Sequence, residues 1–359
     1  MNALPYDGLR EAGWDVHLVV PARWKDDYRP EGFAPDLLPG LSSKARVLPV
    51  LMPGHPQRHL YLTAPGRLVA AAEPDIAFLE QEPFALVTGQ WLGALRRRKI
   101  PFGLQHDENL DRPLPGIARA IRTLAVNRAA FVAARSPQAG ALLRALNPRL
   151  RIEVVPHAVP DWPVLARSAC AGDETFTVGY AGRLTPAKGI RDLLAATERM
   201  APGTRLLVVG NGEMRDEVKR ADTPQRPVEL RTGVGHADMP AVYAEMDVLV
   251  LPSRTTPTWT EQFGRVLVEA MACGVPVVAS DSGEMPWVIE ATGGGVLFPE
   301  GSVDALAAIL TKLRQDPGRR QNLAEQGRAA VERSFSESAI IRQMDSLLRE
   351  ILDTRAARG

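Results

Sequence analysis

Two glutamates flank the start of a predicted helix in the segment EQFGRVLVE, and both could accept hydrogen bonds from hydroxyl groups. Gly264 opens that helix, and the free N–H groups of a helix start favour an anion such as pyrophosphate. Glu269 follows five residues later, about 7–8 Å along the helix, which is about the separation of a ribose from its pyrophosphate. We therefore expect Glu269 to bind ribose hydroxyls, and Glu261 to bind hydroxyls of a sugar. Either glutamate alone would more often be a solvated surface residue, but the arrangement favours a ligand site.

Two further loops could bind phosphate. The loop YAGRLTPAKG follows a predicted buried strand and carries Arg183 and Lys188. A guanidinium offers a planar fork to phosphate oxygens and an ammonium offers a mobile point charge. An anion stabilised by both would be a good leaving group. The alternative is two surface cations. The loop VGNGEMRDEV places Gly210 before another helix, which is a weaker signal because glycine-rich turns between strands and helices are common.

In the first half of the chain, polar residues follow two predicted strands. The tripeptide Glu80-Gln81-Glu82 ends one strand, and His106-Asp107 ends the next. Carboxyl ends of parallel strands share one edge of a sheet, so we expect both groups to face an inter-domain cleft. His106 would bind a sugar or orient an acceptor there, unless it is simply a loop histidine. The remaining histidines lack metal-ligand spacing and are interpreted as structural or surface residues: His17, His55, His59, His157 and His236.

Length and composition set limits on the class of protein. The chain has 359 residues, enough for two domains. Its 43 Lys and Arg nearly cancel 42 Asp and Glu, so the overall charge does not indicate a nucleic-acid partner. Cys170 and Cys273 are far apart, which predicts neither a disulfide nor a zinc framework and fits a reducing compartment. The sequence has no apolar run of about 18 residues and no signal-peptide pattern, so we expect a cytoplasmic protein.

Basic residues cluster in the first half of the chain. Arg96–Lys99 follows one predicted helix, and Arg119, Arg122 and Arg128 lie along the next. Charged helix faces are usually just solvated. The sharper interpretation is a basic face that contacts anionic lipid on the inner membrane surface, or an anionic acceptor.

Short apolar runs alternate with helical patterns such as 58–72, as in parallel α/β sheets. Several runs, among them LLVVG and VLVLP, are continuously apolar and predict strands buried on both faces. The proline-rich stretch Pro156–Asp173 predicts a domain break. The predicted fold class is therefore α/β, with two Rossmann-like, doubly wound domains at 1–160 and 174–335. A C-terminal helix at 336–355 is expected to pack back on the first domain.

Taken together, these residues resemble the family-4 retaining glycosyltransferases, or glycosyl transferases group 1, which have the GT-B fold. The likeness runs along nearly the whole chain and is strongest from Thr175 to Pro299. Four motifs stand in the family's order: GRL…KG, VGNGEMR, YAEMDVLVLPS, and two glutamates with seven residues between them, the first with FG after it and the second followed by AMACGVPVVASD. One such motif would be weak evidence, whereas four in order are highly specific.

The resemblance implies a retaining, metal-independent transferase whose donor substrate is a UDP-, GDP- or ADP-sugar and which uses no cofactor. Glu261 would contact the donor sugar and Glu269 the ribose. The amides of Phe263, Gly264 and Arg265 would meet the sugar and the phosphates.

The resemblance also implies roles on both sides of the reaction. Arg183 and Lys188 would stabilise the departing diphosphate, and His106 would lie beside the transferred sugar. The acceptor would be a glycan, a lipid-linked sugar or a small molecule, as in cell-envelope or polysaccharide biosynthesis. Candidate residues on the acceptor side are Glu80, Glu82 and Asp107.

The chain departs from the family pattern at three places. The family opens with a strand and a Gly-Gly loop, whereas this sequence begins inside the helix that follows them, whose usual end is matched by LREAGWDV. That start predicts a gap or an exposed edge in the first sheet, and it suggests a misplaced start codon or a truncated gene. In SGEMPW, Trp287 stands where an acid is usual, and His157-Ala158 replaces an inter-domain Asn-Gly turn.

Three other functions are weighed against this one. A nucleotide-sugar epimerase on the same fold would need further acids and histidines in the cleft, and the sequence offers no such set. A non-catalytic nucleotide-sugar-binding protein, decayed by loss of the first strand, would bind donors without turnover. An NAD-dependent dehydrogenase is disfavoured because no GxGxxG follows an early strand.

Overall fold

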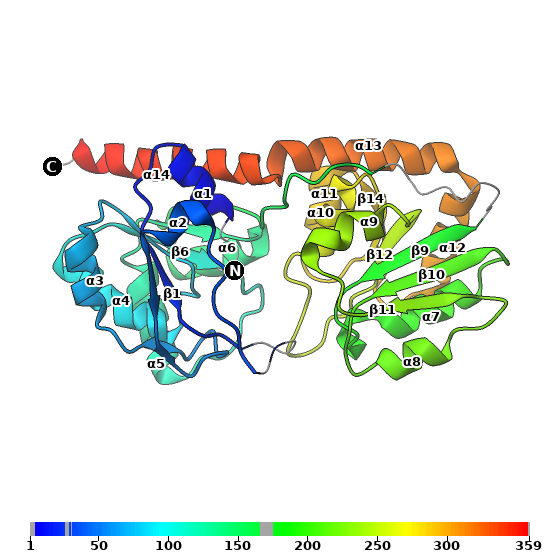
Figure 1. Ribbon diagram of the computed structural model, residues 1–359, viewed down its shortest axis with the longest axis horizontal. Helices are drawn as coiled ribbons and strands as arrows, with labels where there is room; N and C mark the ends of the chain where they lie inside the picture. The colour runs from blue at the N-terminus through cyan, green and yellow to red at the C-terminus, as the bar shows by residue number, and fades with distance from the viewer. Residues whose placement is uncertain (1–3, 26–28, 30, 166–174, 358–359) are drawn as a thin grey trace. The chain divides into compact units, whose positions relative to one another are not determined.

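The computed structural model describes residues 4–25, 29, 31–165 and 175–357. Its contacts divide the chain into two compact units, the first comprising Met1–Ala158 with Glu337–Gly359 and the second Val159–Ser336 (Figure 1). The second unit begins ahead of the expected residue 174, because the N–H of Val159 donates to the carbonyl of Phe335 at 2.9 Å. Part of the predicted domain break, including Cys170, lies outside the described residues.

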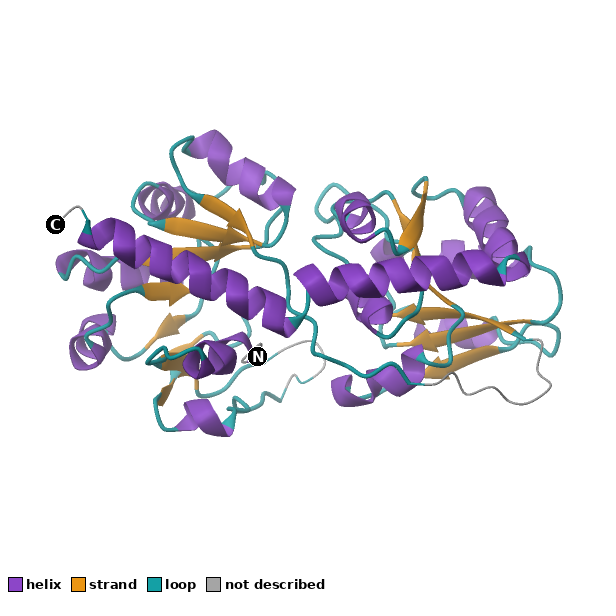
Figure 2. Cartoon of the chain, turned by 90° about the horizontal axis from the view of Figure 1, so that it is seen from above, coloured by secondary structure: helices purple, strands orange, loops and turns teal. Residues whose placement is uncertain are grey.

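Six parallel strands form the sheet of the second unit, in the order β11-β10-β9-β12-β13-β14. Helices cover both faces of this sheet (Figures 1 and 2). Its strands are β9 (Phe176–Ala181), β10 (Thr204–Val209), β11 (Val228–Arg231), β12 (Val248–Leu251), β13 (Val277–Ser280) and β14 (Gly295–Phe298). Its helices are η1 (Pro186–Lys188), α7 (Ile190–Glu198), α8 (Arg215–Arg220), η2 (His236–Asp238), α9 (Met239–Tyr243), α10 (Arg265–Ala272), α11 (Met285–Thr292), α12 (Val303–Gln315) and α13 (Pro317–Ser334).

The winding of this sheet places two loops side by side. The chain enters at β9 in the middle, builds outward to β11, returns to β12 beside β9, and builds the other half. Ligands bind beyond the carboxyl ends of strands where the winding direction reverses, and the loops after β9 and β12 lie there. Every residue of β9, β12 and β13 is buried, which confirms the prediction of strands covered on both faces.

The described strands of the first unit form three separate sheets. Four parallel strands follow the order β5-β6-β7-β8, while β1 and β2 form a parallel pair and β3 and β4 an antiparallel pair. No ladder joins β1 and β2 to the four-stranded sheet within the described ranges. The strands are β1 (Leu18–Pro21), β2 (Ala45–Leu48), β3 (Val50–Leu51), β4 (Leu60–Tyr61), β5 (Ala77–Leu79), β6 (Phe102–His106), β7 (Phe131–Ala134) and β8 (Ile152–Val154).

The last helix of the chain belongs to the first unit. Its buried residues Ile340 and Met344 pack in one cluster with Leu9 and Phe131. The indole Nε1 of Trp14 donates to Asp345 Oδ1 at 2.7 Å. The helices of this unit are α1 (Leu4–Glu11), α2 (Pro39–Ser42), α3 (Pro65–Ala72), α4 (Leu86–Arg97), α5 (Gly116–Val126), α6 (Pro137–Leu146) and α14 (Glu337–Ala356).

The predicted helix at 58–72 is wrong in its first half. There, β4 pairs antiparallel with β3, and α3 begins only at Pro65. Proline suits the first position of a helix but lacks the N–H that a helix interior requires. Residues 58–64 therefore cannot continue the helix that follows them.

Candidate functional site

The loops after β9 and β12 bring Lys188 and Glu261 together. Lys188 Nζ donates to Glu261 Oε2 at 2.6 Å, and the hydroxyl of Ser253 donates to the same oxygen at 2.7 Å. The Lys188 ammonium also lies 4.8 Å from the centre of the Trp259 ring. The side chains of Lys188 and Glu261 are only 14% and 9% exposed, so solvent screens their charges weakly.

Gly189 explains how these two loops approach so closely. Its φ is +68°, and a Cβ at this position would lie 1.8 Å from the carbonyl oxygen of Pro252. Next to it, the N–H of Arg254 donates to the carbonyl of Ala187 at 2.7 Å. Only glycine tolerates both the backbone conformation and this contact, so the KG pair of the motif aligns Lys188 with the β12 loop.

Arg183 and Gly210 lie on two loops that also touch. The N–H of Leu184 donates to the carbonyl of Asn211 at 2.9 Å, and a Cβ on Gly210 would lie 1.8 Å from the carbonyl oxygen of Gly182. Gly210 thus serves the packing of the loops after β9 and β10, whatever ligand they bind. Arg183 is exposed, and its main-chain carbonyl accepts from the hydroxyl of Tyr180 at 2.7 Å.

Helix α10 begins after Gly264, which adopts a left-handed conformation and has no side chain to cap the helix. The preceding residue, Phe263, is buried, and its ring lies 6.1 Å from the rings of both Trp287 and Phe335. Trp287, at the position where an acid is usual, therefore packs beneath Phe263. This aromatic cluster fixes the start of α10, whose N–H groups favour an anion.

Glu269 is buried and has three side-chain partners. Its Oε2 accepts from the Tyr243 hydroxyl at 2.9 Å, while Oε1 lies 2.9 Å from Arg265 Nε and 3.1 Å from His236 Nε2. Tyr243 is fully buried, whereas the side chains of Arg265 and His236 are 42% and 49% exposed. A ligand hydroxyl could therefore displace the partners of Oε1 while Tyr243 holds the other oxygen.

The surroundings of Glu269 also affect two neighbouring titratable groups. Burial, reinforced by the Glu269 carboxylate, raises the pKa of Tyr243 well above its ordinary value, so this hydroxyl stays a donor. The same two causes raise the pKa of Cys273 to about 12. Cys273 therefore remains a thiol at neutral pH and is unsuited to act as a nucleophile.

Several of these partners lie outside the residues predicted from the sequence. The spacing of His236 predicts a structural or surface role, yet its ring lies beside Glu269 and 4.8 Å from the ring of Trp162. His236 and Glu269 are too far apart in the chain for a local sequence pattern to predict their contact. Ser253 could have been found, because it closes the YAEMDVLVLPS motif.

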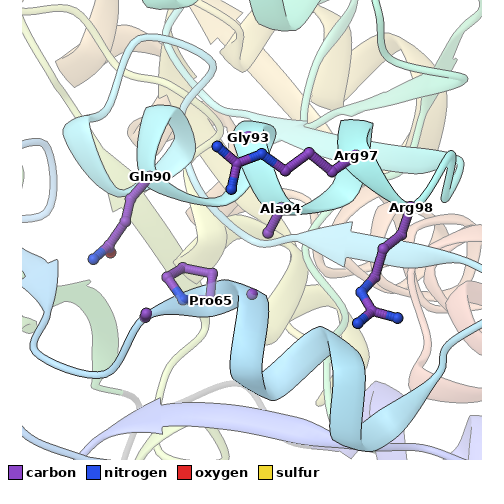
Figure 3. Close-up of a pocket in the computed structure, with 8 residues that line it drawn as sticks. Pro65, Gln90, Gly93, Ala94, Arg97 and Arg98 are labelled. Carbon is purple, nitrogen blue, oxygen red and sulfur yellow. The ribbon is translucent and has the colours of Figure 1, made fainter.

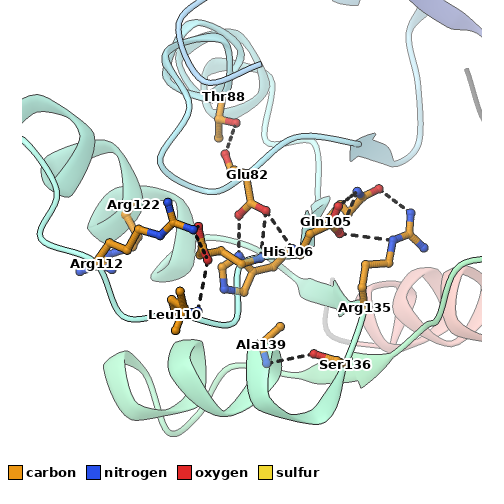
Figure 4. Close-up of polar contacts among 12 residues, drawn as sticks. Glu82, Thr88, Gln105, His106, Leu110, Arg112, Arg122, Arg135, Ser136 and Ala139 are labelled. Carbon is orange, nitrogen blue, oxygen red and sulfur yellow. Dashed lines mark hydrogen bonds and ion pairs between the residues drawn. The ribbon is translucent and has the colours of Figure 1, made fainter. Parts of the chain in front are cut away.

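The predicted residues of the first unit form a second cluster (Figure 4). Nδ1 of His106, at the end of β6, lies 2.6 Å from Glu82 Oε2. Arg135, which the sequence does not single out, lies between the other two acids. Its Nε is 3.5 Å from Asp107 Oδ1, and one terminal nitrogen is 3.7 Å from Glu80 Oε1.

This clustering of acids makes stability depend on pH. Burial, with the Glu82 carboxylate adding to it, raises the pKa of Asp107 from 3.8 to about 6. Between these values the folded protein binds the proton more tightly than the unfolded chain, so stability falls as pH rises through the window. Relative to the wild type, Asp107→Asn should gain on the order of 1–3 kcal/mol in free energy of unfolding between about pH 4 and pH 7.

Denaturant unfolding of both proteins across this pH range measures the difference. The exposed Asp353 on α14, in the same unit, provides the control Asp353→Asn, for which no comparable pH-dependent gain is expected. A constant difference between Asp107→Asn and the wild type at all pH values would contradict the assignment.

Comparison with known proteins covers both halves of the chain. Residues 6–158 match the glycosyl transferase 4-like domain, and residues 167–330 match glycosyl transferases group 1. The GDP-mannose-dependent monoacylated alpha-(1-6)-phosphatidylinositol monomannoside mannosyltransferase of Corynebacterium glutamicum is 33% identical over 183 residues, 49% of this chain and 48% of that protein. The chain spans about half the length of the curated relatives it matches.

Two solved structures show the same fold. Sucrose-phosphate synthase from Thermosynechococcus elongatus aligns with a TM-score of 0.74 and 22% identity, over 98% of this chain and 92% of that one. Anabaena HepE, solved in complex with UDP, aligns with a TM-score of 0.66 and 23% identity, over 80% and 82% of the chains. These likenesses confirm the predicted two-domain α/β architecture of the GT-B type.

Proposed function

Because this chain belongs to the group 1 glycosyltransferases, with a glycosyl transferase 4-like domain ahead of the group 1 domain, we propose that it transfers a sugar from a nucleotide-diphosphate sugar to an acceptor. The observation that carries the proposal is the group of residues in the second unit: Lys188 paired with Glu261, the uncapped start of α10, and the buried carboxylate of Glu269. The UDP bound to HepE and the GDP-mannose named for the corynebacterial relative support a nucleotide-diphosphate donor.

The geometry suits stabilisation of a departing diphosphate. The Lys188 ammonium and the N–H groups at the start of α10 supply positive charge where negative charge develops. Glu261 holds the ammonium through one oxygen, and we assign it also to hydroxyls of the donor sugar. Arg183, on the loop after β9, would add a second cation.

Retention of configuration is part of the proposal. The acceptor oxygen would attack the sugar carbon on the face from which the diphosphate leaves. As the new C–O bond forms and the bond to phosphate breaks, the acceptor proton passes to the departing phosphate. This route needs no separate carboxylate base.

We further propose that transfer does not depend on a metal ion, because protein cations can neutralise the diphosphate. Among the residues that the structure describes, no three His, Cys, Asp or Glu side chains are arranged to hold a metal ion.

The acids of the first unit suit the acceptor side, since carboxylates accept hydrogen bonds from hydroxyls of a glycan, a lipid-linked sugar or a small molecule. These acids are Glu80 and Asp107, because the oxygens of Glu82 already contact His106 and two main-chain N–H groups.

A panel of UDP-, GDP- and ADP-sugars tests the proposal. We expect one of them to raise the melting temperature and to release nucleoside diphosphate slowly, faster when a mixture of glycan and lipid-linked acceptors is added. Binding without release under any of these conditions would favour a non-catalytic binding protein instead.

We also propose that the basic face of the first unit contacts an anionic membrane surface. On α5, the outward residues Ile117 and Leu124 are 66% and 40% exposed, and Arg119 and Arg128 are exposed on the same helix and just beyond it. Apolar residues flanked by arginines are the pattern of helices that lie at a membrane interface. None of the helices in the described ranges has the length and apolar character needed to cross a bilayer.

A second cationic feature lies on the neighbouring helix. Arg97, the last residue of α4, and Arg98, which follows it, line a groove of about 640 Å³ beside Pro65 at the start of α3 (Figure 3). Both arginines are exposed. Both charges therefore remain available for lipid phosphates.

Neutralising the arginines of α5 should weaken this contact. Each basic residue near an anionic surface contributes about 1 kcal/mol, so Arg119→Gln with Arg128→Gln should lower partitioning into anionic phospholipid vesicles by about 30-fold. Cosedimentation measures the change. The pair Arg215→Gln and Arg220→Gln, exposed on α8, is the matched control. The proposal would be contradicted if both double variants lost the same amount of vesicle binding. It would also be contradicted if the wild type bound neutral vesicles as strongly as anionic ones.

A further inference from the structure

His106 is held at one ring nitrogen, while its other ring nitrogen is buried without a partner. Nδ1 lies 2.6 Å from Glu82 Oε2, and the side chain is only 3% exposed. Nε2 has no hydrogen-bond partner among the described residues. A buried polar atom left in this way costs free energy, so its position requires an explanation.

Glu82 is held through its carboxylate and through its main chain (Figure 4). Its Oε1 accepts from the main-chain N–H groups of Asp107 at 2.8 Å and Glu108 at 3.2 Å. The hydroxyl of Thr88 donates to the main-chain carbonyl of Glu82 at 2.8 Å. With Oε1 occupied by two N–H donors, only Oε2 can face the imidazole, and it faces it as an acceptor.

An acceptor at Oε2 determines where the imidazole proton lies. The proton of the neutral ring must be on Nδ1, because that nitrogen donates to Glu82. Nε2 is then left with a lone pair and can only accept. The unpartnered nitrogen is therefore suited to an O–H or N–H donor.

We propose that Glu82 is a positioning residue: it fixes the Nδ1–H tautomer of His106, so that Nε2 accepts a hydrogen bond from a hydroxyl of the sugar that is transferred. This inference rests on the proposed glycosyl transfer and assigns a role to Glu82 within it. Because the His106 side chain is only 3% exposed, the proposal includes a local rearrangement when the sugar binds, in which the N–H groups of Asp107 and Glu108 stay on Glu82.

Glu82→Gln is the sharpest variant. The N–H groups of Asp107 and Glu108 still require an oxygen, so the glutamine oxygen stays on them and its NH₂ group turns to the imidazole. His106 must then accept at Nδ1 and carry its proton on Nε2. The substitution keeps the size of the side chain and reverses the tautomer.

Long-range ¹⁵N–¹H spectra of the full chain measure the tautomer directly, with His106→Gln used to assign the signals. We expect the wild type to show a protonated Nδ1 and a bare Nε2, and Glu82→Gln to show the reverse. A wild-type ring protonated on Nε2 would overturn the proposal. This measurement uses the wild-type protein, so it stands even where a variant fails to fold.

Transfer kinetics complete the test. Glu82→Gln should lower kcat on the order of 10-fold to 100-fold while leaving the Kd for nucleoside diphosphate unchanged. Glu350 lies on α14 of the same unit and pairs with Arg151, so the control Glu350→Gln also removes a carboxylate and should leave kcat unchanged. A reversed tautomer with wild-type kcat would overturn the role toward the sugar. A wild type that transfers no sugar from any donor would instead refute the proposed function, while the tautomer measurement is unaffected.

Discussion

Replacing Lys188 with alanine is expected to lower the turnover of sugar transfer by about 100-fold to 1,000-fold. Its ammonium lies 2.6 Å from Glu261 in a largely buried setting, where a charge acts more strongly than in water. Removing it takes away a cation from the place where the leaving diphosphate gains charge. The loss should appear mainly in kcat, because this interaction strengthens as the bond to phosphate breaks.

Two further variants make the result specific. Lys219→Ala removes an exposed lysine of α8 in the same unit, and should change turnover by less than roughly twofold. Lys188→Ala combined with Glu261→Gln tests whether the loss comes from an unpaired buried carboxylate rather than a missing cation. Recovery of turnover in that double variant, or wild-type turnover in Lys188→Ala, would contradict the assigned role.

Replacing Glu269 with glutamine is expected to raise the Kd for nucleoside diphosphate by about 10-fold to 100-fold. The carboxylate can accept from two ribose hydroxyls if they displace the half-exposed His236 and Arg265, with Tyr243 keeping the orientation. A glutamine offers one acceptor oxygen instead of two. Isothermal titration calorimetry of the wild type and the variant gives the ratio of Kd values.

The stability of the variants separates binding from folding at this position. Glu269→Ala leaves the buried Tyr243 hydroxyl without an acceptor and should cost about 1–3 kcal/mol in free energy of unfolding, whereas Glu269→Gln retains an acceptor. Glu290→Gln, an exposed position on α11, is the control for both measurements. An unchanged Kd in Glu269→Gln would show that the ribose does not bind here.

The sheet of the second unit could be predicted because its strands are continuous apolar runs separated by helical patterns. β9 and β12 are buried along their whole length, and chain order alone places the loops that follow them at the same edge. The helix after Gly264 was predictable for a similarly local reason. These features depend on the hydrophobic pattern of short segments, which can be read from the sequence without knowing the tertiary structure.

The contacts inside the site could not be predicted in the same way. The pairing of Lys188 with Glu261 depends on a close approach that Gly189 permits to Pro252, a contact between residues far apart in the chain. His236 reaches Glu269 through a short turn without periodicity. Side-chain partners of this kind follow from tertiary arrangement rather than local pattern.

The first unit shows the same limit in its secondary structure. The helical pattern of 58–72 extends across β4, yet Pro65 and the pairing of β4 with β3 restrict the helix to α3. Arg135, between Glu80 and Asp107, comes from β7–α6 sequence that carries no motif. Here too the chemistry depends on which strands become neighbours.

The most direct test of the donor site is a crystal structure of the protein with the nucleoside diphosphate that binds it. We predict ribose hydroxyls within hydrogen-bond distance of Glu269, phosphates at the start of α10, and the terminal phosphate beside Lys188. A nucleotide bound elsewhere, or bound with its ribose away from Glu269, would contradict the account.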